Sequence, residues 1–424
     1  MRAFELPAAD AARSRAATGL SLRVYENLDD LKALRPAWTQ LLAQYQPATT
    51  FCTWEWLSCW WECFGKDRQL LVLALFDANS LVGLAPLSIS RERLWRVPLR
   101  VLRLMGDGSG DSDNLDLPVQ PGFERDFATA ILKHLRERGR QWDVCLLNTL
   151  PSNSRAADHL AELLKSPSWT FFDDFSKSSS VPLPETWEAY ADQLSSEDRK
   201  NLTRYARRLQ ARHTTRIYRC TEPDELAVCL DALFRLHQGR WQSAGKAGSF
   251  SSPERQQFYK QLSHSLLARG WLELWILKID AEIAAVQFAF RYRDKVFQLQ
   301  EGYDHNRSSD RPGFVLRGAV LQQLILEKVR TYDFLGGEDR YKTRWGAREG
   351  IYRQLHFART DSLGAVWLEC LDRATKSKEW LRQKVPATVW RALHRANVAL
   401  QVVVFRKGEP EDFPGPRDSK HASG

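Results

Sequence analysis

Glu301-Gly-Tyr-Asp-His-Asn-Arg-Ser-Ser-Asp-Arg-Pro-Gly-Phe314 joins a strand pattern to a helix pattern through a short polar loop. Apolar residues alternate over residues 295–303, as in a β-strand, and recur at helical spacing over residues 313–329. Pro312 falls in the first helical turn, where its missing N–H costs little. Free N–H groups and partial positive charge at a helix N-terminus suit a phosphate. The segment therefore predicts an anion-binding turn, against the alternative of an ordinary loop that leads into a helix.

The sequence on both sides of this segment follows one plan. Strands are expected at residues 216–219, 271–279, 283–292, 295–303, 331–335 and 352–359, and helices at residues 222–241, 253–269, 313–329 and near 341–345. The first half repeats this order, with strands at 21–25, 69–76, 81–90, 99–105, 142–148 and 169–175 and helices at 28–45, 54–64, 123–138 and 154–164. Pro121-Gly122-Phe123 and Pro312-Gly313-Phe314 open matching helices; Asp143 follows the first glycine after 21 residues and Asp333 the second after 20. Matching order and a shared marker predict a duplicated fold, with a linker near residues 176–184.

Composition indicates a folded protein of two or three domains. The chain has 424 residues, of which 43% are apolar and 16 are tryptophan, so it can fill sizeable cores. Its formal charge of +9 indicates an anionic partner, for which CoA, a nucleotide sugar, a lipid diphosphate, tRNA and an anionic membrane all qualify. The seven cysteines are scattered and no paired Cys/His ligands follow them, so no metal is expected. Reduced thiols and the lack of an apolar stretch of ~18 residues predict a cytoplasmic protein, which can still lie against the inner membrane face.

Motifs of the second half resemble a known family of bacterial acetyltransferases. They are His237-Gln-Gly-Arg-Trp241, Gly245-Lys-Ala-Gly-Ser-Phe250, Phe258-Tyr259, Gly302-Tyr-Asp304, Pro312-Gly313, Tyr332-Asp-Phe-Leu-Gly-Gly337 and Tyr341-Lys-Thr-Arg-Trp-Gly346. Phe51-Cys-Thr-Trp-Glu-Trp-Leu57 and Trp60-Trp61 resemble the family's first domain. In this order the motifs are similar to the GNAT (N-acetyltransferase) proteins of cellulose and exopolysaccharide gene clusters, named CelD-like or BioF2-like, over residues 21–360. The plan is also similar to that of the Fem aminoacyl transferases, which pair two GNAT-like domains.

This resemblance implies an α/β (α+β) fold of two tandem GNAT (acyl-CoA N-acyltransferase) domains, each a mixed, mostly antiparallel sheet flanked by helices. The expected division is a disordered tail at 1–19, a degenerate N-terminal GNAT-like domain at 20–180, a basic helical arm at 181–214, the acyltransferase domain at 215–362, a C-terminal helical extension at 363–406 and a disordered tail at 407–424. Within the arm, Ser195 and Asp198 predict a helix cap. Residues 373–395 form a second basic amphipathic stretch, which predicts docking on a membrane or a synthase partner, or packing against the second domain.

Acyl transfer needs a held diphosphate, a polarised carbonyl and a base for the proton of the nucleophile. The resemblance implies acetyl-CoA or another acyl-CoA as co-substrate, and no metal. Its expected contacts are Gly302, Tyr303, Arg307, Arg311, Gly313 and Phe314. The expected catalytic residues are Glu301, Asp333, Tyr341 and Lys342; Tyr341-Lys342 matches the Phe-Lys pair of Fem proteins, whose lysine is implicated in stabilising the reacting carbonyl. Asp304, His305, Glu338 and Asp339 remain alternatives for the base, and Tyr303 for a general acid.

Substrate contacts are expected from both halves of the chain. His237, Arg240 and Trp241 end a helix and face either the substrate or the sheet. Arg204 and Arg208 belong to a run of eight basic residues, without an acid, between residues 199 and 219, which favours an anionic ligand. The loop 106–116 takes the position of a diphosphate loop but carries acids that repel phosphate. The first domain is therefore expected not to bind CoA and to shape the acceptor cleft, with Asp113 and Asn114 lining it.

The expected function is transfer of an acyl group, in the first place acetyl, from acyl-CoA to an amine or hydroxyl of a sugar or envelope-polysaccharide precursor. Two alternatives are a Fem-like transferase that uses aminoacyl-tRNA and a non-catalytic accessory protein of a polysaccharide synthase. The expected partners are an anionic small molecule or saccharide and a membrane polysaccharide synthase. tRNA is the less favoured partner and DNA is not expected, because no recognised nucleic-acid module accompanies the basic run.

Overall fold

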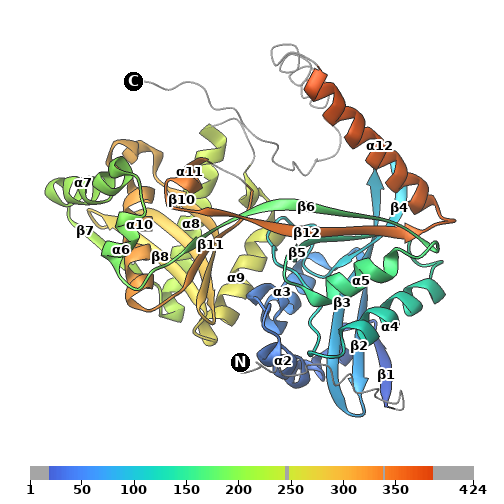
Figure 1. Ribbon diagram of the computed structural model, residues 1–424. Helices are drawn as coiled ribbons and strands as arrows, with labels where there is room; N and C mark the ends of the chain where they lie inside the picture. The colour runs from blue at the N-terminus through green and yellow to red at the C-terminus, as the bar shows by residue number, and fades with distance from the viewer. Residues whose placement is uncertain (1–18, 244–247, 338–339, 385–424) are drawn as a thin grey trace, which may run out of the picture.

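The computed structural model describes residues 19–243, 248–337 and 340–384. Its strands form one continuous twelve-stranded sheet in the order β1-β2-β3-β4-β5-β12-β6-β11-β10-β9-β8-β7 (Figure 1). The first half supplies β1 (Leu20–Tyr25), α1 (Leu28–Lys32), α2 (Arg35–Gln44), α3 (Trp54–Phe64), β2 (Arg68–Asp77), β3 (Ser80–Leu94), β4 (Val97–Leu104), α4 (Glu124–Glu137), β5 (Val144–Pro151), α5 (Arg155–Leu164) and β6 (Trp169–Pro182). The second supplies α6 (Trp187–Asp192), α7 (Ser196–Arg212), β7 (Thr215–Arg219), α8 (Pro223–Ser243), α9 (Pro253–Ala268), β8 (Leu272–Ile279), β9 (Glu282–Tyr292), β10 (Lys295–Tyr303), α10 (Pro312–Leu326), β11 (Thr331–Gly336), α11 (Arg340–Thr343), β12 (Arg348–Arg359) and α12 (Leu363–Lys384).

Local sequence signals explain where several elements begin and end. The hydroxyl of Ser195 accepts a hydrogen bond from the N–H of Asp198 at the start of α7, which confirms the predicted cap. Asp280 and Ala281 adopt positive φ in the two-residue turn between β8 and β9, as a tight hairpin requires. The single helix expected at residues 28–45 is wrong: it is divided into α1 and α2, and a proline stands in the first turn of α2.

Each half builds the expected mixed, mostly antiparallel sheet flanked by helices. In the first half β1 to β4 are antiparallel neighbours and β4 pairs with β5 in parallel. In the second half β7 to β10 repeat the antiparallel run and β10 pairs with β11 in parallel. The same order and the same single parallel pair in both halves confirm the duplicated fold.

The linker expected near residues 176–184 is wrong, because most of that segment is the second part of strand β6. β6 pairs along its length with β12, and its end also pairs with β11 of the second half, from Thr331↔Pro182 to Gly336↔Ser178. β12, the last strand of the chain, lies between β5 and β6 and so completes the sheet of the first half. The two halves thus exchange strands, and the sequence boundary near residue 180 separates repeats within one sheet.

A shared hydrophobic core reinforces this exchange. Helix α3 of the first half packs against α9, its counterpart in the second, and one cluster of buried side chains contains residues of both halves. Trp56 stacks edge-on against Phe258 with ring centroids 5.4 Å apart, and Phe51 meets Phe290 at 5.3 Å. Burial of such large rings is a major favourable term in folding, so the halves stabilise each other.

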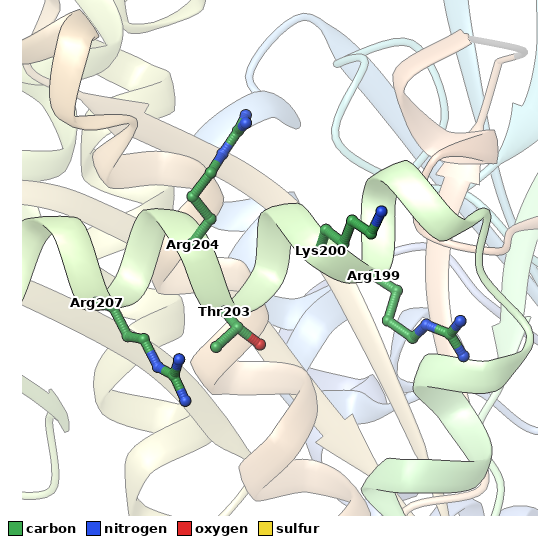
Figure 2. A pocket seen from close by; sticks show the side chains of 5 residues that line it. All are labelled: Arg199, Lys200, Thr203, Arg204 and Arg207. Carbon is green, nitrogen blue, oxygen red and sulfur yellow. The ribbon is translucent and has the colours of Figure 1, made fainter.

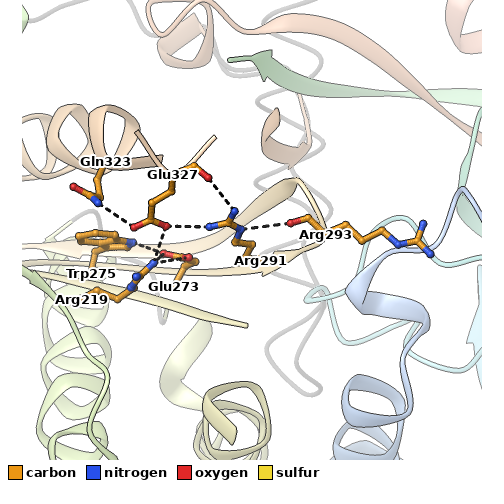
Figure 3. Close-up of polar contacts among 7 residues, drawn as sticks. All are labelled: Arg219, Glu273, Trp275, Arg291, Arg293, Gln323 and Glu327. Carbon is orange, nitrogen blue, oxygen red and sulfur yellow. Dashed lines mark hydrogen bonds and ion pairs between the residues drawn. The ribbon is translucent and has the colours of Figure 1, made fainter. Parts of the chain in front are cut away.

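Arg293, at the β9–β10 turn, connects the two halves by hydrogen bonds. Its guanidinium donates to the carbonyl oxygens of Leu42 at 2.7 Å and Tyr45 at 3.2 Å, at the C-terminal end of α2. A cation there satisfies carbonyl groups that have no partner within the helix and complements the negative end of its dipole. Figure 3 shows Arg293 beside a network that fastens the sheet edge to the end of α10, formed by Arg219, Glu273, Trp275, Arg291, Gln323 and Glu327.

Two helical segments lie outside the duplicated plan. Helix α7, the basic arm, packs against α10 of the second half. Helix α12 packs against the sheet through Ala365, Trp367 and Leu368, which precede the basic stretch 373–395. Residues 385–395 of that stretch lie outside the described residues. Within the described residues, no helix combines the length and the apolar character needed to cross a bilayer.

Candidate functional site

Strands β10 and β11 separate in the middle of the sheet and form a fork. Their parallel pairing covers only Lys295↔Thr331 to Phe297↔Asp333. β10 then bulges between Gln298 and Gln300 and continues to Tyr303 beside β9, while β11 continues to Gly336 beside β6. Backbone N–H and C=O groups of β10 that would face a parallel neighbour are therefore free of β11, and a strand-like ligand can take that place.

Helix α10 begins at the open end of the fork. Its N-cap, Arg311, adopts a left-handed conformation (φ 55°) and its side chain makes no capping hydrogen bond, which leaves the first-turn N–H groups to other acceptors. A Cβ at Gly313 would lie 3.2 Å from the ring of Tyr303, so a glycine allows that ring to pack closely. This end of α10 thus has the uncapped helix start that an anion-binding turn needs, and Tyr303 lies close to Gly313 there.

Helix α7 adds positive charge to the same place. The ring of Tyr205 packs edge-on against Phe314 at 5.3 Å, and the guanidinium groups of Arg204 and Arg311 lie 4.9 Å and 5.9 Å from its centroid. Two expected contacts from distant parts of the sequence, Arg204 and Arg311, thus share one tyrosine. Figure 2 shows the cationic surface of α7, to which Arg199, Lys200, Thr203, Arg204 and Arg207 contribute. Arg208 is exposed on the same helix.

Asp333 lies at the point where the fork opens. One carboxyl oxygen accepts a hydrogen bond from the N–H of Leu335 at 2.7 Å, and Leu335 has a left-handed backbone (φ 63°). Burial, with a smaller contribution from the nearby Asp113 carboxylate, raises the pKa of the Asp333 carboxyl from 3.8 to about 6. The residue is still partly exposed. A carboxylate with a pKa near neutrality that solvent can reach is suited to general-base catalysis.

The first half contributes Asp113 and Asn114 to this place. Asp113 accepts a hydrogen bond from the N–H of Gly336 at 2.9 Å, and the amide of Asn114 donates to the hydroxyl of Tyr352 at 2.9 Å. Burial raises the pKa values of Asp113 and Tyr352. The structure therefore brings together Asp113, Asn114 and Asp333, all expected from the sequence, and adds Tyr352, which sequence reasoning missed.

Lys342 is buried, with 3% of its surface exposed, below the end of β11. Its ammonium donates to the carbonyl oxygens of Phe334 at 3.3 Å, Gly336 at 2.7 Å and Gly337 at 3.0 Å. Three N–H groups thus meet three carbonyl groups of the segment that carries Asp333. Its charge also lowers the pKa values of Asp113 and Asp333, as one of several smaller effects. In this arrangement Lys342 holds β11 in shape.

Glu301 and Tyr341 belong to a cluster around Arg317, which adjoins Asp333 through Phe334. Arg317 is a buried cation on α10 that forms an ion pair with Glu301. Its guanidinium lies 5.3 to 5.5 Å from the ring centroids of Phe334, Tyr341 and Trp345. Sequence reasoning missed Arg317, although it is the only charged residue in the apolar helix α10. That isolated charge was a usable signal, because a buried arginine needs a partner.

The other expected residues that the structure describes, His237, Gly302 and Arg307, have structural partners of their own. His237 is buried against Phe250, with ring centroids 4.9 Å apart, so its ring packs in the core. A Cβ at Gly302 would lie 2.7 Å from the backbone nitrogen of His237, so Gly302 serves the close crossing of α8 over β10. Arg307 forms ion pairs with Asp280 at 3.7 Å and Asp304 at 3.8 Å. The side chains of Arg240 and Trp241 lie outside the described residues, as do Glu338 and Asp339.

The acidic loop 106–116 of the first half packs against the second half. Asp111 is buried; its carboxylate accepts hydrogen bonds from Arg255 at 2.8 Å and from the hydroxyl of Tyr259 at 2.9 Å, both on α9. Asp116, whose pKa burial raises to about 6, is bonded to Tyr45 and Ser154. Asp111 therefore connects the two halves, whereas Asp116 is bound within the first half. No group of three or more His, Cys, Asp and Glu side chains with metal-binding geometry occurs among the described residues.

Comparison with known proteins agrees with this geometry. Residues 196–343 match the family model described as an acetyltransferase (GNAT) domain. The solved structure of FemX covers 75% of this chain and 95% of its own, with a TM-score of 0.52 and 10% identity, which is a likeness of fold alone.

A conserved protein of unknown function from Bacteroides thetaiotaomicron is similar with a TM-score of 0.49 and 13% identity, over 77% of this chain and 97% of that one. A tandem GNAT protein from the clavulanic acid biosynthesis pathway is similar with a TM-score of 0.46 and 15% identity, over 80% of this chain and 98% of that one. No curated protein sequence matches the chain. The chain is a transferase with an acetyltransferase (GNAT) domain at residues 196–343, and its first half repeats the strand order of the second.

Proposed function

We propose that the second half transfers an acyl group, in the first place acetyl, from acyl-CoA to an amine or hydroxyl of a sugar or envelope-polysaccharide precursor, like the BioF2-like and CelD-like proteins that its motifs resemble. The observation that carries this proposal is the fork between β10 and β11, with Asp333 at its apex and the N-terminus of α10 at its open end. The match of residues 196–343 to an acetyltransferase domain supports the same chemistry.

In this mechanism, the diphosphate of acyl-CoA binds the first-turn N–H groups of α10, with Arg204 and Arg311 nearby to neutralise its charge. The pantetheine arm lies in the fork as a strand would, and backbone N–H groups of β10 polarise the thioester carbonyl. Asp333 accepts the proton of the attacking amine or hydroxyl. The new bond forms at the carbonyl carbon, the carbon–sulfur bond breaks, and the thiolate leaves and is protonated, with Tyr341 as the expected acid.

Calorimetric titration of the full chain with acetyl-CoA tests this proposal. We expect binding to weaken about tenfold or more in Arg311→Glu, since a cation beside the diphosphate becomes an anion. Arg330→Glu is the matched control, because Arg330 is exposed and, among the described residues, forms an ion pair with Glu185 alone, at 3.4 Å. Asp333→Asn should bind acetyl-CoA like the wild type and lose transfer to an amino sugar. Absence of heat with every acyl-CoA tried would remove this function.

A transferase that uses aminoacyl-tRNA is the second candidate, and the basic surface of α7 favours it. Arg207 and Arg208 are exposed there and form no ion pair with any described residue. A one-sign helix face of this kind binds phosphate groups of any polyanion. Treatment with ribonuclease distinguishes the two candidates: transfer from acyl-CoA is unaffected by it, whereas transfer from aminoacyl-tRNA is lost.

A further inference from the structure

The tip of the β3–β4 hairpin presents a tryptophan to solvent. Trp95 and Arg96 form the two-residue turn with φ values of 49° and 67°, and 57% of the Trp95 surface is exposed. Turns of this type favour glycine or asparagine, and a left-handed conformation is costly for a bulky side chain. More than half of this tryptophan remains exposed in a strained turn, which points to a contact outside the chain.

Helix α12 extends the same apolar surface. Trp367 packs against Trp95, with ring centroids 6.3 Å apart, so the hairpin tip and the helix form one unit. On the side of α12 that faces away from the sheet, Leu363 and Val366 are 54% and 58% exposed, and Trp380 further along is 58% exposed. Figure 1 shows α12 running out from the body of the molecule past the end of β4. We name the hairpin tip, formed by Trp95 and Arg96, together with Leu363, Val366 and Trp380, the tip surface.

Unpaired positive charge surrounds the tip surface. Arg91, Arg93 and Arg96 are exposed on the hairpin, and none of them forms an ion pair with a described residue. The two other arginines of the hairpin strands behave differently: Arg100 is bound by Asp143 at 2.7 Å and Arg103 by Glu92 at 3.0 Å. Three arginines at the protruding end thus remain available to an anionic partner.

We propose that the tip surface binds the headgroup region of an anionic lipid bilayer, as a peripheral contact. Tryptophan and arginine at a protruding tip suit the interface of a membrane, where the indole ring lies among headgroups and the guanidinium groups meet lipid phosphates. An extended, deformable anionic surface can contact the hairpin tip and the exposed side of α12 at once. This contact is independent of the transfer site on the second half.

Sedimentation of the full chain with vesicles tests the proposal. We expect the protein to bind vesicles of phosphatidylglycerol and phosphatidylcholine, and to bind pure phosphatidylcholine much more weakly. Arg93→Glu with Arg96→Glu should lower the partition coefficient by more than tenfold, since each basic residue near the surface contributes roughly fivefold. Trp95→Ser with Val366→Ser should lower it through loss of the apolar contact. Leu326→Ser is the matched control, because Leu326 is exposed on the distant end of α10.

Three results would overturn the proposal. They are absence of binding to anionic vesicles, binding that persists in both sets of variants, and binding that is lost in Arg204→Glu with Arg207→Glu on α7 while the hairpin variants keep it. Light scattering tests whether the protein self-associates through the tip surface. If the protein is a dimer that does not bind vesicles, and Trp95→Ser with Val366→Ser makes it a monomer, the tip surface is a contact between two copies of the chain. Circular dichroism confirms that each variant is folded before it is scored.

Discussion

The ionised carboxylate of Asp333 lowers the stability of the folded protein, because it is buried at the fork. Burial raises the pKa of its carboxyl from 3.8 to about 6, so the folded protein holds the proton more tightly than the unfolded chain does. The stability that this proton contributes is present below the unfolded pKa and is lost as the pH rises through about 6. A carboxylate kept ionised at neutral pH in such a site is typical of a functional group that the fold tolerates.

Asp333→Asn should therefore stabilise the protein while it abolishes transfer. We expect about 1 to 2 kcal/mol at pH 8, the value for this pKa difference reduced for the partial exposure of the carboxyl, and less than half of that at pH 4.5. Urea unfolding at both pH values measures the change. In the wild type, kcat/KM should rise with pH up to about 6 and then level off. Glu185→Gln, an exposed control, should change neither quantity; a destabilised Asp333→Asn at pH 8 would contradict the argument.

Substitution of Lys342 can distinguish a cation that contacts the substrate from one that stabilises the fold around β11. The resemblance to Fem proteins implies contact with the reacting carbonyl, whereas here its hydrogen bonds go to three carbonyl groups around β11. We expect Lys342→Met to lower the unfolding free energy by about 2 to 4 kcal/mol, since buried carbonyl groups lose a charged donor. The acid limb of the pH–rate profile should also move to higher pH, because the ammonium lowers the pKa of Asp333. An unchanged profile with a lower kcat would favour the carbonyl role.

Arg293 carries the clearest prediction at the scale of elements. Its guanidinium caps the last carbonyl groups of α2, with hydrogen bonds to Leu42, Ala43, Tyr45 and Gln46. We expect Arg293→Ala to cost about 1 to 2 kcal/mol, as for an exposed charged donor that is shared among several carbonyl acceptors. Arg330→Ala, which removes an exposed pair with Glu185, should cost less than about 0.5 kcal/mol. If urea unfolding gives equal losses of unfolding free energy in the two variants, the hydrogen bonds of Arg293 to α2 do not stabilise the protein.

Strand β6 shows which elements the sequence can and cannot predict. Residues 169–175 were predicted as a strand from their aromatic side chains, but the serine-rich continuation to Pro182 was predicted as a linker. Serine has low β-propensity, yet this part of β6 is paired on both sides, by β11 and β12. Strand propensity depends on tertiary partners, and a single sequence does not reveal which distant strand will supply them.

The candidate site likewise contains residues that the sequence can predict and residues that it cannot. Asp333 and the N-terminus of α10 were predictable, because each lies within a short segment whose pattern marks a strand end or a helix start. The contact of Asn114 with Tyr352 was not, because it joins residues 238 positions apart and depends on the exchanged strand β12. Asp111 was noted only as part of an acidic loop, since its partners Arg255 and Tyr259 are on α9 of the other half.

At the scale of the whole molecule, strand exchange makes the two halves one thermodynamic unit. β12 supplies the first half with the strand between β5 and β6, and β6 supplies the second half with the neighbour of β11. Separation of the halves would leave sheet edges with unpaired backbone groups and would expose the aromatic contact between α3 and α9. The duplication therefore differs from two domains joined by a linker, which unfold independently.

Calorimetry can test this unity. The full chain should unfold in a single transition with equal calorimetric and van't Hoff enthalpies. A chain that ends at Ala347, and so lacks β12 and α12, should lose the cooperative transition of both halves, because β5 and β6 lose their shared partner and the buried Leu355 and Phe357 are removed. A chain that ends at Lys384 keeps both elements and should unfold like the full chain. If the second half of the chain ending at Ala347 still melts at the original temperature and binds acetyl-CoA, its fork does not depend on the strand exchange. Loss of both properties would mean that an intact first half is required to hold Asp333 and β11 in place, although its loop 106–116 carries acids where a diphosphate would bind.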